Sequence, residues 1–371
     1  MVVCLIFFSV LVLYLLVIFR ANNLFIRLKF FQPLQYIYSP VTIIIPARNE
    51  EDNIGRCLES ILAQDYPMDM MEIIVVDDQS DDRTVEIVNS FRDPRIKLIR
   101  ISSDEKFGKK SAVAKGIRSS NNEIIITTDA DCSFHKNWLA SLVTCKVERN
   151  AVMVAAPVAF RKEKSYLDIF QSLDFISLQG ITAVAVTNHL FNMCNGANLL
   201  YTKTAFEKVN GFDGIDQIAS GDDMLLMEKI EKAFPNQVSY CYSHDAIVST
   251  ATAGSWKAFM QQRIRWASKA KNYTSISIKA TLSLVFMVNL IPMILLCASI
   301  YNTSNLKYYF LFLLIKAIGE LPFMLHVSIF FSKQRLIAWF IPSQMIHTLY
   351  TVVAAFLGFI PQYDWKGRRV R

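Results

Sequence analysis

Apolar and polar residues are distributed unevenly along this chain, with long uncharged apolar runs at both ends. Residues 2–19 form one such run, about as long as the shortest helix that spans a bilayer. Core helices of soluble proteins are rarely so long and so apolar, so we expect transmembrane helices at both ends. Three further runs follow residue 280: 281–301, 308–331 and 336–360. The second of these contains Lys316 and Glu320, one helical turn apart, which we expect to form an ion pair inside the protein.

Basic residues beside the apolar runs indicate how the chain crosses a membrane. Arg20, Arg27 and Lys29 follow the run at 2–19, and Lys269, Lys271 and Lys279 precede the run at 281–301. Basic flanks favour the cytoplasmic side, so we expect the middle segment to be cytoplasmic. We also expect the first run to be a retained N-terminal anchor rather than a cleaved signal peptide. Three C-terminal spans would place the basic tail at 366–371 outside. Either 308–331 or 336–360 is therefore re-entrant or interfacial, or the tail departs from the rule.

Between residues 40 and 250 the pattern changes to short β-branched runs that alternate with helical spacing. Nearly continuous apolar strands that alternate with helices are typical of a parallel sheet built from βαβ units. Ligands of such sheets bind beyond the carboxyl ends of the strands. The pattern predicts strands at 41–46, 71–77, 96–101 and 123–128, helices at 50–64 and 84–91, and a basic segment at 109–118.

Polar residues gather where the predicted strands end. Residues 46–50 follow the first strand, Asp77 and Asp78 end the second, and Asp129 and Asp131 follow the fourth. No glycine-rich phosphate loop follows the first strand. An acidic rim of this kind holds a diphosphate through a divalent cation, and Mg²⁺ typically uses one or two carboxylates plus phosphate oxygens. The alternative is that these aspartates only cap turns and helices.

Charge and cysteine content narrow the class of protein. The chain has 39 Lys+Arg against 32 Asp+Glu, a net charge of +7. Because basic residues flank the apolar runs, anionic lipid accounts for this charge better than nucleic acid does. The 7 cysteines are scattered without close pairs, which favours reduced thiols over a disulfide framework or a zinc site.

Taken together, the motifs resemble those of membrane-bound family 2 glycosyltransferases, such as cellulose, hyaluronan and poly-N-acetylglucosamine synthases and ceramide glucosyltransferase. The resemblance implies a GT-A fold, an α/β, Rossmann-like domain with a mostly parallel sheet, facing the cytoplasm between N- and C-terminal transmembrane helices. The motifs that carry it are IPARNE at 45–50, VDDQS at 76–80, Gly108-Lys109, Asp129-Ala-Asp131, Gly211-Phe-Asp213, Gly221-Asp-Asp223 and QRIRW at 262–266. The expected divisions are an anchor at 1–20, a juxtamembrane segment at 21–39, the GT-A domain at 40–250, an amphipathic interface segment at 251–279, and a C-terminal membrane region with its basic tail at 280–371.

The resemblance also implies how the donor is bound. Asp77 or Asp78 would hydrogen-bond the uracil of a UDP-sugar, and Lys109 would lie near the diphosphate. Mg²⁺ or Mn²⁺ would bind at Asp129 and Asp131, with Asp131 as the direct ligand. Around the base the family pattern places Pro46, Arg48 and Glu50.

Three further segments match other parts of the family's site, around the donor sugar, the diphosphate and the acceptor. Asp223 matches the catalytic base and Asp222 replaces the usual glutamate, although both could equally cap a helix that begins at residue 224. Asn195 and Gly196 either shape the donor-sugar pocket or form an ordinary turn. Arg265 would bind the diphosphate, while Gln262 and Trp266 would shape the acceptor end of the site. The alternative is that residues 255–270 form an amphipathic helix that lies at the membrane interface and has no catalytic part.

These implications predict an inverting, metal-dependent hexosyl- or N-acetylhexosaminyltransferase that resides in the cell membrane. In a bacterium this membrane would be the inner membrane. The donor would be a nucleotide sugar, and the acceptor a lipid or lipid-linked molecule at the cytoplasmic face. A processive polysaccharide synthase with a glycan acceptor is the alternative, with Lys316 and Glu320 lining the path of the acceptor as a further possibility. Known processive synthases have more membrane helices than the four expected here. A nucleotidyltransferase and an inactive membrane scaffold are further alternatives, and no nucleic-acid partner is expected.

Overall fold

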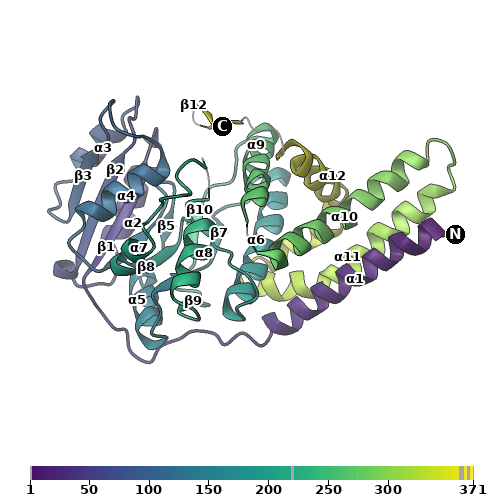
Figure 1. The fold of residues 1–371 in the computed structure, drawn as a ribbon, viewed down its shortest axis with the longest axis horizontal. Helices are drawn as coiled ribbons and strands as arrows, with labels where there is room; N and C mark the ends of the chain where they lie inside the picture. The colour runs from purple at the N-terminus through teal and green to yellow at the C-terminus, as the bar shows by residue number, and fades with distance from the viewer. Residues whose placement is uncertain (1, 219–220, 274, 359–362, 366–367, 371) are drawn as a thin grey trace.

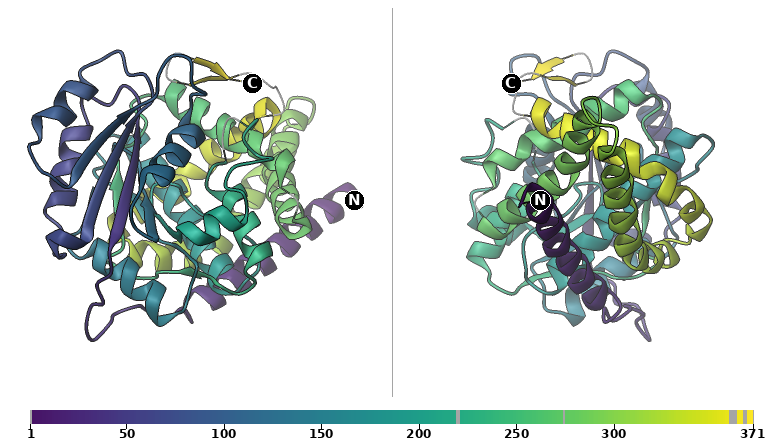
Figure 2. Two further views of the ribbon diagram at one scale, coloured as in Figure 1. Left: turned by 60° about the vertical axis from the view of Figure 1, so that its left-hand side comes forward. Right: turned by 90° about the vertical axis from the view of Figure 1, so that its right-hand side faces the viewer.

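The computed structural model describes residues 2–218, 221–273, 275–358, 363–365 and 368–370. An α/β half contains the sheets, and a helical half extends from it (Figure 1). The N-terminal helix α1 (Val2–Phe25) lies along α11 (Asn305–Phe330) at the far end of the helical half. The two turned views show the same division between the sheet and the long helices (Figure 2).

The central sheet has seven strands in the order β3-β2-β1-β4-β8-β6-β9. Its first four strands pair in parallel and are followed by antiparallel β8, so the predicted mostly parallel α/β sheet is confirmed. The strands are β1 (Val41–Ala47), β2 (Met71–Asp77), β3 (Ile96–Arg100), β4 (Ile124–Thr127), β6 (Met153–Ala155), β8 (Leu199–Thr202) and β9 (Val238–Tyr240). A second sheet joins β5 (Ser133–Phe134), β10 (Val248–Thr250) and β7 (Val158–Phe160).

Alternating residues of the buried strands face two different cores. Ile43 and Ile45 pack toward α2 (Ile54–Leu62), α3 (Thr84–Ser90) and α5 (Trp138–Glu148). Ile44 packs on the other side, toward α4 (Lys109–Ser119). This period of two follows from strand geometry. The parallel pairing of β1 with β2 and β4 places the carboxyl ends of these strands side by side. The helix expected over 50–64 begins only at Ile54, because residues 51–53 form a turn.

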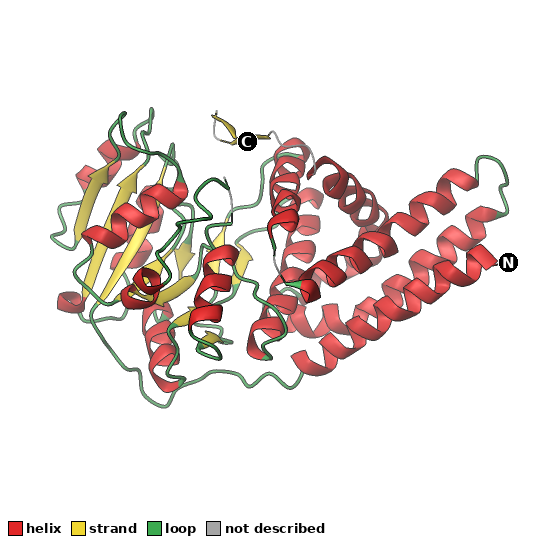
Figure 3. Ribbon diagram, in the orientation of Figure 1, coloured by secondary structure: helices red, strands yellow, loops and turns green. Residues whose placement is uncertain are grey.

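The remaining helices and 3₁₀ turns connect the strands to one another or to the helical half (Figure 3). They are the helices α7 (Lys203–Lys208), α8 (Met224–Ala233) and α9 (Trp256–Ala267), and the 3₁₀ turns η1 (Met68–Met70), η2 (Ser268–Asn272) and η3 (Gln334–Trp339). The C-terminal hairpin pairs β11 (Tyr363–Trp365) with β12 (Arg368–Val370).

In the described part of the chain, five helices are long and apolar enough to cross a membrane. Four coincide with the expected runs: α1, α10 (Ile276–Ala298), α11, and η3 with α12 (Phe340–Gly358). Residues 359–362, 366–367 and 371, which hold the end of the last run and part of the basic tail, lie outside the described residues. The side of the membrane on which the tail lies stays a prediction.

The fifth helix, α6 (Tyr166–Thr187), is not among the runs that the sequence pattern predicts. It lies between the α/β half and the long helices, and 78% of its apolar window is buried inside the protein. Packing against protein on most sides therefore explains its apolar character, and its polar residues Asp174 and Gln179 are buried within the molecule.

The charged pair inside α11 is confirmed as an ion pair. Lys316 Nζ lies 3.0 Å from Glu320 Oε1, one helical turn away. Gln344 of α12 joins them, accepting from Lys316 at 2.8 Å and donating to Glu320 at 2.9 Å. Tyr14 of α1 also donates to Glu320, at 2.6 Å. These contacts compensate both charges within the helix bundle and tie three apolar helices together.

Candidate active site

Lys109 lies at the centre of a charged cluster at the carboxyl ends of the strands. Its Nζ is 2.7 Å from Asp129 Oδ1 and 3.2 Å from Asp222 Oδ2. Burial would lower the pKa of Lys109, but the carboxylates of Asp129 and Asp222 outweigh it and raise that pKa above its ordinary value. The side chain therefore stays an ammonium group. Gly108 precedes it with φ of 105°, a conformation that favours glycine, and presents Lys109 at the first residue of α4.

Asp223 is held by three donors at the start of α8. Its Oδ1 accepts from the Met224 N–H at 2.8 Å and lies 3.4 Å from Lys269 Nζ. Its Oδ2 accepts from the Gly196 N–H at 3.2 Å. The expected helix cap therefore exists, and the same carboxylate lies in the charged cluster.

The neighbouring carboxyl group, Asp222, pairs with Lys109. Burial would raise its pKa, but the charges of Lys109 and Lys269 outweigh this effect and hold the pKa of Asp222 below its ordinary value. Asp222 therefore lies in a positive local field that favours its ionised form.

Gly196 occupies a position where a side chain would collide with this cluster. A Cβ atom there would lie 3.1 Å from Lys109 Nζ, 3.2 Å from Asp222 Oδ2 and 3.5 Å from the Asp223 Cβ. The segment is also a turn, because Asn195 Oδ1 accepts from the Ala197 N–H. The two interpretations of residues 195–196 are thus compatible: the turn brings a bare backbone against the charged groups.

Asp131 lies beside the cluster and is half-buried. Its Oδ2 accepts from the Thr250 hydroxyl at 2.9 Å. Burial, with the negative charge of Asp129 added, raises the pKa of the Asp131 carboxyl. The charge of Glu50 acts in the same direction. Within the described residues, no group of three or more His, Cys, Asp or Glu side chains is arranged to hold a metal ion.

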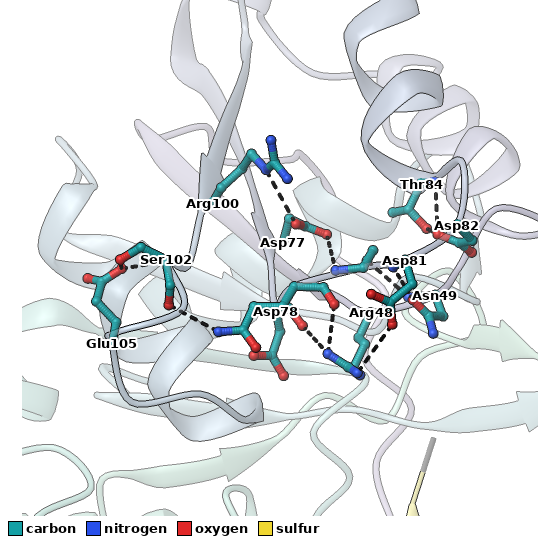
Figure 4. A network of polar contacts seen from close by, with 12 residues as sticks. Arg48, Asn49, Asp77, Asp78, Asp81, Asp82, Thr84, Arg100, Ser102 and Glu105 are labelled. Carbon is teal, nitrogen blue, oxygen red and sulfur yellow. Dashed lines mark hydrogen bonds and ion pairs between the residues drawn. The ribbon is translucent and has the colours of Figure 1, made fainter. Parts of the chain in front are cut away.

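A second polar network lies at the ends of β1 and β2 (Figure 4). Arg48 donates to the carbonyls of Asp78 and Gln79 at 2.7 and 2.8 Å. Asp77 and Asp78 are both buried, and Asp77 Oδ2 lies 3.7 Å from Arg100 Nε. Asp78 Oδ1 accepts from the Gly108 N–H at 3.1 Å, so this network connects directly to the turn that presents Lys109.

The two other residues expected around the base have mainly structural contacts. Pro46 lies within β1, in register with Val76 of β2. The Glu50 N–H donates to Thr84, and its carboxylate accepts from Asn53. Both residues still lie at the edge of the sheet on which the charged cluster is built.

Helix α9 turns a different arginine inward than the motif suggests. Arg263 is buried, pairs with Asp174 Oδ2 at 2.5 Å, and its guanidinium stacks 4.2 Å from the centre of the Trp266 ring. Gln262 accepts from Arg263 at 3.3 Å. The guanidinium of Arg265 forms no ion pair within the part of the chain that the structure describes.

Three residues of these networks are not among the predicted site residues. They are Arg263, its partner Asp174, and Lys269, which contacts Asp223. Lys269 carried a usable signal, because it follows Arg265 by four residues and Gln262 by seven, a spacing that shares one helix face. Asp174 carried none, since its position in an apolar helix says nothing about its partner.

Comparison with known proteins identifies the domain. Residues 42–209 match the family model described as Glycosyl transferase family 2. The chain carries a family 2 glycosyltransferase domain. The matched range includes Lys109, Asp129, Asp131 and Gly196, while Asp222, Asp223 and α9 lie beyond it.

Two curated relatives are similar to parts of this chain. Glycosyltransferase AglE of Haloferax volcanii is 28% identical over 207 residues, which cover 56% of this chain and 65% of the relative. The probable glycosyltransferase YdaM of Bacillus subtilis is 30% identical over 234 residues, covering 61% and 54%. The chain thus spans between about half and two thirds of the length of these relatives.

A solved structure supports the fold over almost the whole chain. The mannosyltransferase PcManGT from Pyrobaculum calidifontis, in complex with GDP-Man and Mn²⁺, aligns with a TM-score of 0.62 over 95% of this chain and 96% of that one. The sequence identity is 21%, so the likeness establishes the GT-A fold of the family 2 domain.

Proposed function

We propose that this protein is an inverting, metal-dependent glycosyltransferase that moves a sugar from a nucleotide sugar to a lipid or lipid-linked acceptor at the cytoplasmic face of a membrane. The cluster of Lys109, Asp129, Asp222 and Asp223 supports this function most directly. It combines an ammonium group for a diphosphate with a separate carboxylate for the acceptor, at the edge of the sheet where such ligands bind.

The donor would lie across the two polar networks. Lys109 is a permanently charged group on a flexible stem, suited to the diphosphate. The base would lie by Arg48, Asp77 and Asp78, which Gly108 joins to Lys109. The GDP-Man in the aligned mannosyltransferase supports a nucleotide-sugar donor. Uracil is our preferred base, because the VDDQS motif at 76–80 resembles that of UDP-sugar enzymes.

A divalent cation fits the carboxylates of the DAD motif. Asp131 and Asp129 repel one another, and burial adds to this in raising the pKa of Asp131, so a cation there would relieve a real electrostatic cost. Asp131 would be the direct ligand and Asp129 the second, with phosphate oxygens completing the shell. The Mn²⁺ of the aligned structure supports this assignment. When bound, Mg²⁺ or Mn²⁺ supplies positive charge that stabilises the departing diphosphate.

Asp223 is the proposed catalytic base. It would take the proton of the acceptor hydroxyl as that oxygen attacks the anomeric carbon and the bond to the diphosphate breaks. Two backbone N–H groups and Lys269 hold this carboxylate in place. Lys109, which is already positively charged, would stabilise the negative charge that develops on the leaving diphosphate.

The helices favour an acceptor that resides in the bilayer. Among the described residues, five helices are long and apolar enough to cross it. Helix α9, which carries Gln262, Arg265 and Trp266, packs against the last of them, α12. A lipid acceptor would approach the cluster from this side. The processive alternative makes a different prediction, namely a polymer product retained after the donor is exhausted.

A donor screen tests the proposal. Purified full-length protein in detergent, with Mn²⁺ and membrane lipid extract, would be given several UDP- and GDP-sugars, and nucleotide release would be followed. Metal-dependent release from one donor, lost in Asp223→Asn and kept in the exposed surface control Asp69→Asn, is expected. Release that survives Asp223→Asn would overturn the assignment of the base. Absence of release from every donor would overturn the proposed activity.

A further inference from the structure

Lys269 lies one helical turn beyond Arg265, just after the end of α9. It lies in η2, which follows α9 directly, and only 11% of its side chain is exposed. Its Nζ lies 3.4 Å from Asp223 Oδ1. Gln262, Arg265 and Lys269 follow one another at helical spacing, so the lysine continues the face that the QRIRW motif begins.

We propose that Lys269 is a positioning residue for the Asp223 carboxylate, an inference that rests on the proposed function of Asp223 as the base. The contacts divide the charges of the cluster into two sets. Lys109 is engaged by Asp129 and Asp222, and Lys269 is the lysine that contacts Asp223. Without Lys269, the Asp223 carboxylate would keep its two backbone N–H donors and lose the ammonium group beside it.

The stem of Lys269 lies near the turn that carries the aspartates. A Cβ atom placed on Gly221 would lie 4.0 Å from Lys269 Cδ. The head of the lysine lies beside the Asp223 carboxylate, and this ion pair limits the rotation of Asp223.

Three fixed donors leave the carboxylate little freedom. Gly196 N–H holds Oδ2, while Met224 N–H and Lys269 hold Oδ1. The two backbone donors belong to the domain itself, but Lys269 comes from the segment that leads into the membrane helices. The orientation of the base therefore depends on how α9 and η2 dock, and a displacement of about 1 Å costs on the order of a hundredfold in rate.

The chain offers a matched control in Lys271. It lies in the same 3₁₀ segment and carries the same charge, but its side chain is exposed. Loss of general positive charge near the membrane would affect Lys269→Met and Lys271→Met alike. Loss of a specific contact with Asp223 would affect only the first.

The test uses full-length protein and the donor that the screen identifies. We expect Lys269→Met to lower kcat by about ten- to a hundredfold, with the affinity for the free nucleotide plus Mn²⁺ within about twofold of wild type. Lys269→Arg should recover most of kcat, and Lys271→Met should match wild type. In an Asp223→Asn background, Lys269→Met should add no further loss.

The outcomes separate the inference from the function beneath it. Equal kcat for Lys269→Met and Lys271→Met would overturn the positioning role while leaving the transferase intact. A loss of nucleotide affinity as large as the loss of kcat would overturn it too, since Lys269 would then be a diphosphate ligand. If no donor is turned over, a double-mutant cycle in Tm between Lys269→Met and Asp223→Asn still tests the contact, and additive shifts would refute it.

Discussion

Arg263 of α9 should be required for stability although it is not one of the invariant letters of the QxxRW pattern. Its guanidinium and the Asp174 carboxylate are 4% and 3% exposed and lie 2.5 Å apart. The Arg263→Met substitution keeps the aliphatic stem but leaves Asp174 as a buried charge whose remaining partners are Tyr350 and His347 of α12. We therefore expect a large loss of stability.

The magnitude follows from the burial of the pair. Removing one partner of a buried ion pair costs about 3–5 kcal/mol, because the other charge stays desolvated. The stacking of Arg263 on Trp266 and Phe259, at 4.2 and 4.7 Å, is lost as well and places the cost toward the upper end. For a chain of this size we expect the Tm to fall by about 4–6 °C.

Thermal unfolding in detergent, followed by tryptophan fluorescence, measures this effect. The control is Arg83→Met, because the Arg83–Glu86 pair is about 70% exposed on both sides and such pairs contribute about 1 kcal/mol at most. The Asp174→Leu, Arg263→Met double variant should be more stable than the sum of the single losses indicates, since neither charge is then stranded. If Arg263→Met unfolds at the same temperature as Arg83→Met, the role assigned to the buried pair is wrong.

Three further predictions concern the cluster itself. Gly196→Ala should lower kcat by at least about tenfold, because its Cβ would press on Lys109 and Asp222, whereas Gly254→Ala, which faces open space, should not; steady-state nucleotide release compares them. Lys109→Gln should bind Mn²⁺ a few-fold more tightly in the absence of nucleotide, because Lys109 no longer competes for Asp129; the electron paramagnetic resonance signal of free Mn²⁺ measures this, and unchanged affinity would contradict it. Burial lowers the pKa of Lys110 to about 8, from 10.5, so the unfolded chain binds more protons between these values. The Tm of wild type should therefore rise relative to the Tm of Lys110→Met as the pH rises from about 8 to about 10.5. A constant difference between the two Tm values over this pH range would refute the prediction.

Several elements could be predicted from local pattern because their causes are local. The four β-branched runs form β1 to β4 within one residue of the expected ends. The apolar runs at the two ends form long helices for the same reason, since a continuous apolar surface suits only a buried or lipid-facing helix. The late start of α2 at Ile54 escaped the pattern, because it depends on a turn at residues 51–53 rather than on hydrophobic spacing.

Helix α6 and its aspartate show where local pattern fails. The apolar residues of α6 indicate burial but not against what, and Asp174 within it looks like an interruption. In the folded protein this aspartate joins α6, α9 and α12 through Arg263 and Tyr350. Whether Arg263 or Arg265 faces inward was likewise undetermined, because both are basic and only the position of Asp174 distinguishes them.

The alternation of strands and helices, the apolar helices, and the carboxylates at the strand ends can be predicted from the amino-acid sequence, since each follows from the side chains of neighbouring residues. The pairing of each lysine with its aspartate instead depends on the folding of the whole chain. Lys109 pairs with Asp129 and Asp222, while Lys269 reaches Asp223 from a segment beyond the matched family domain. An ion pair depends on separations of a few ångströms between residues that are distant in the chain, and those separations are set by how the helices pack.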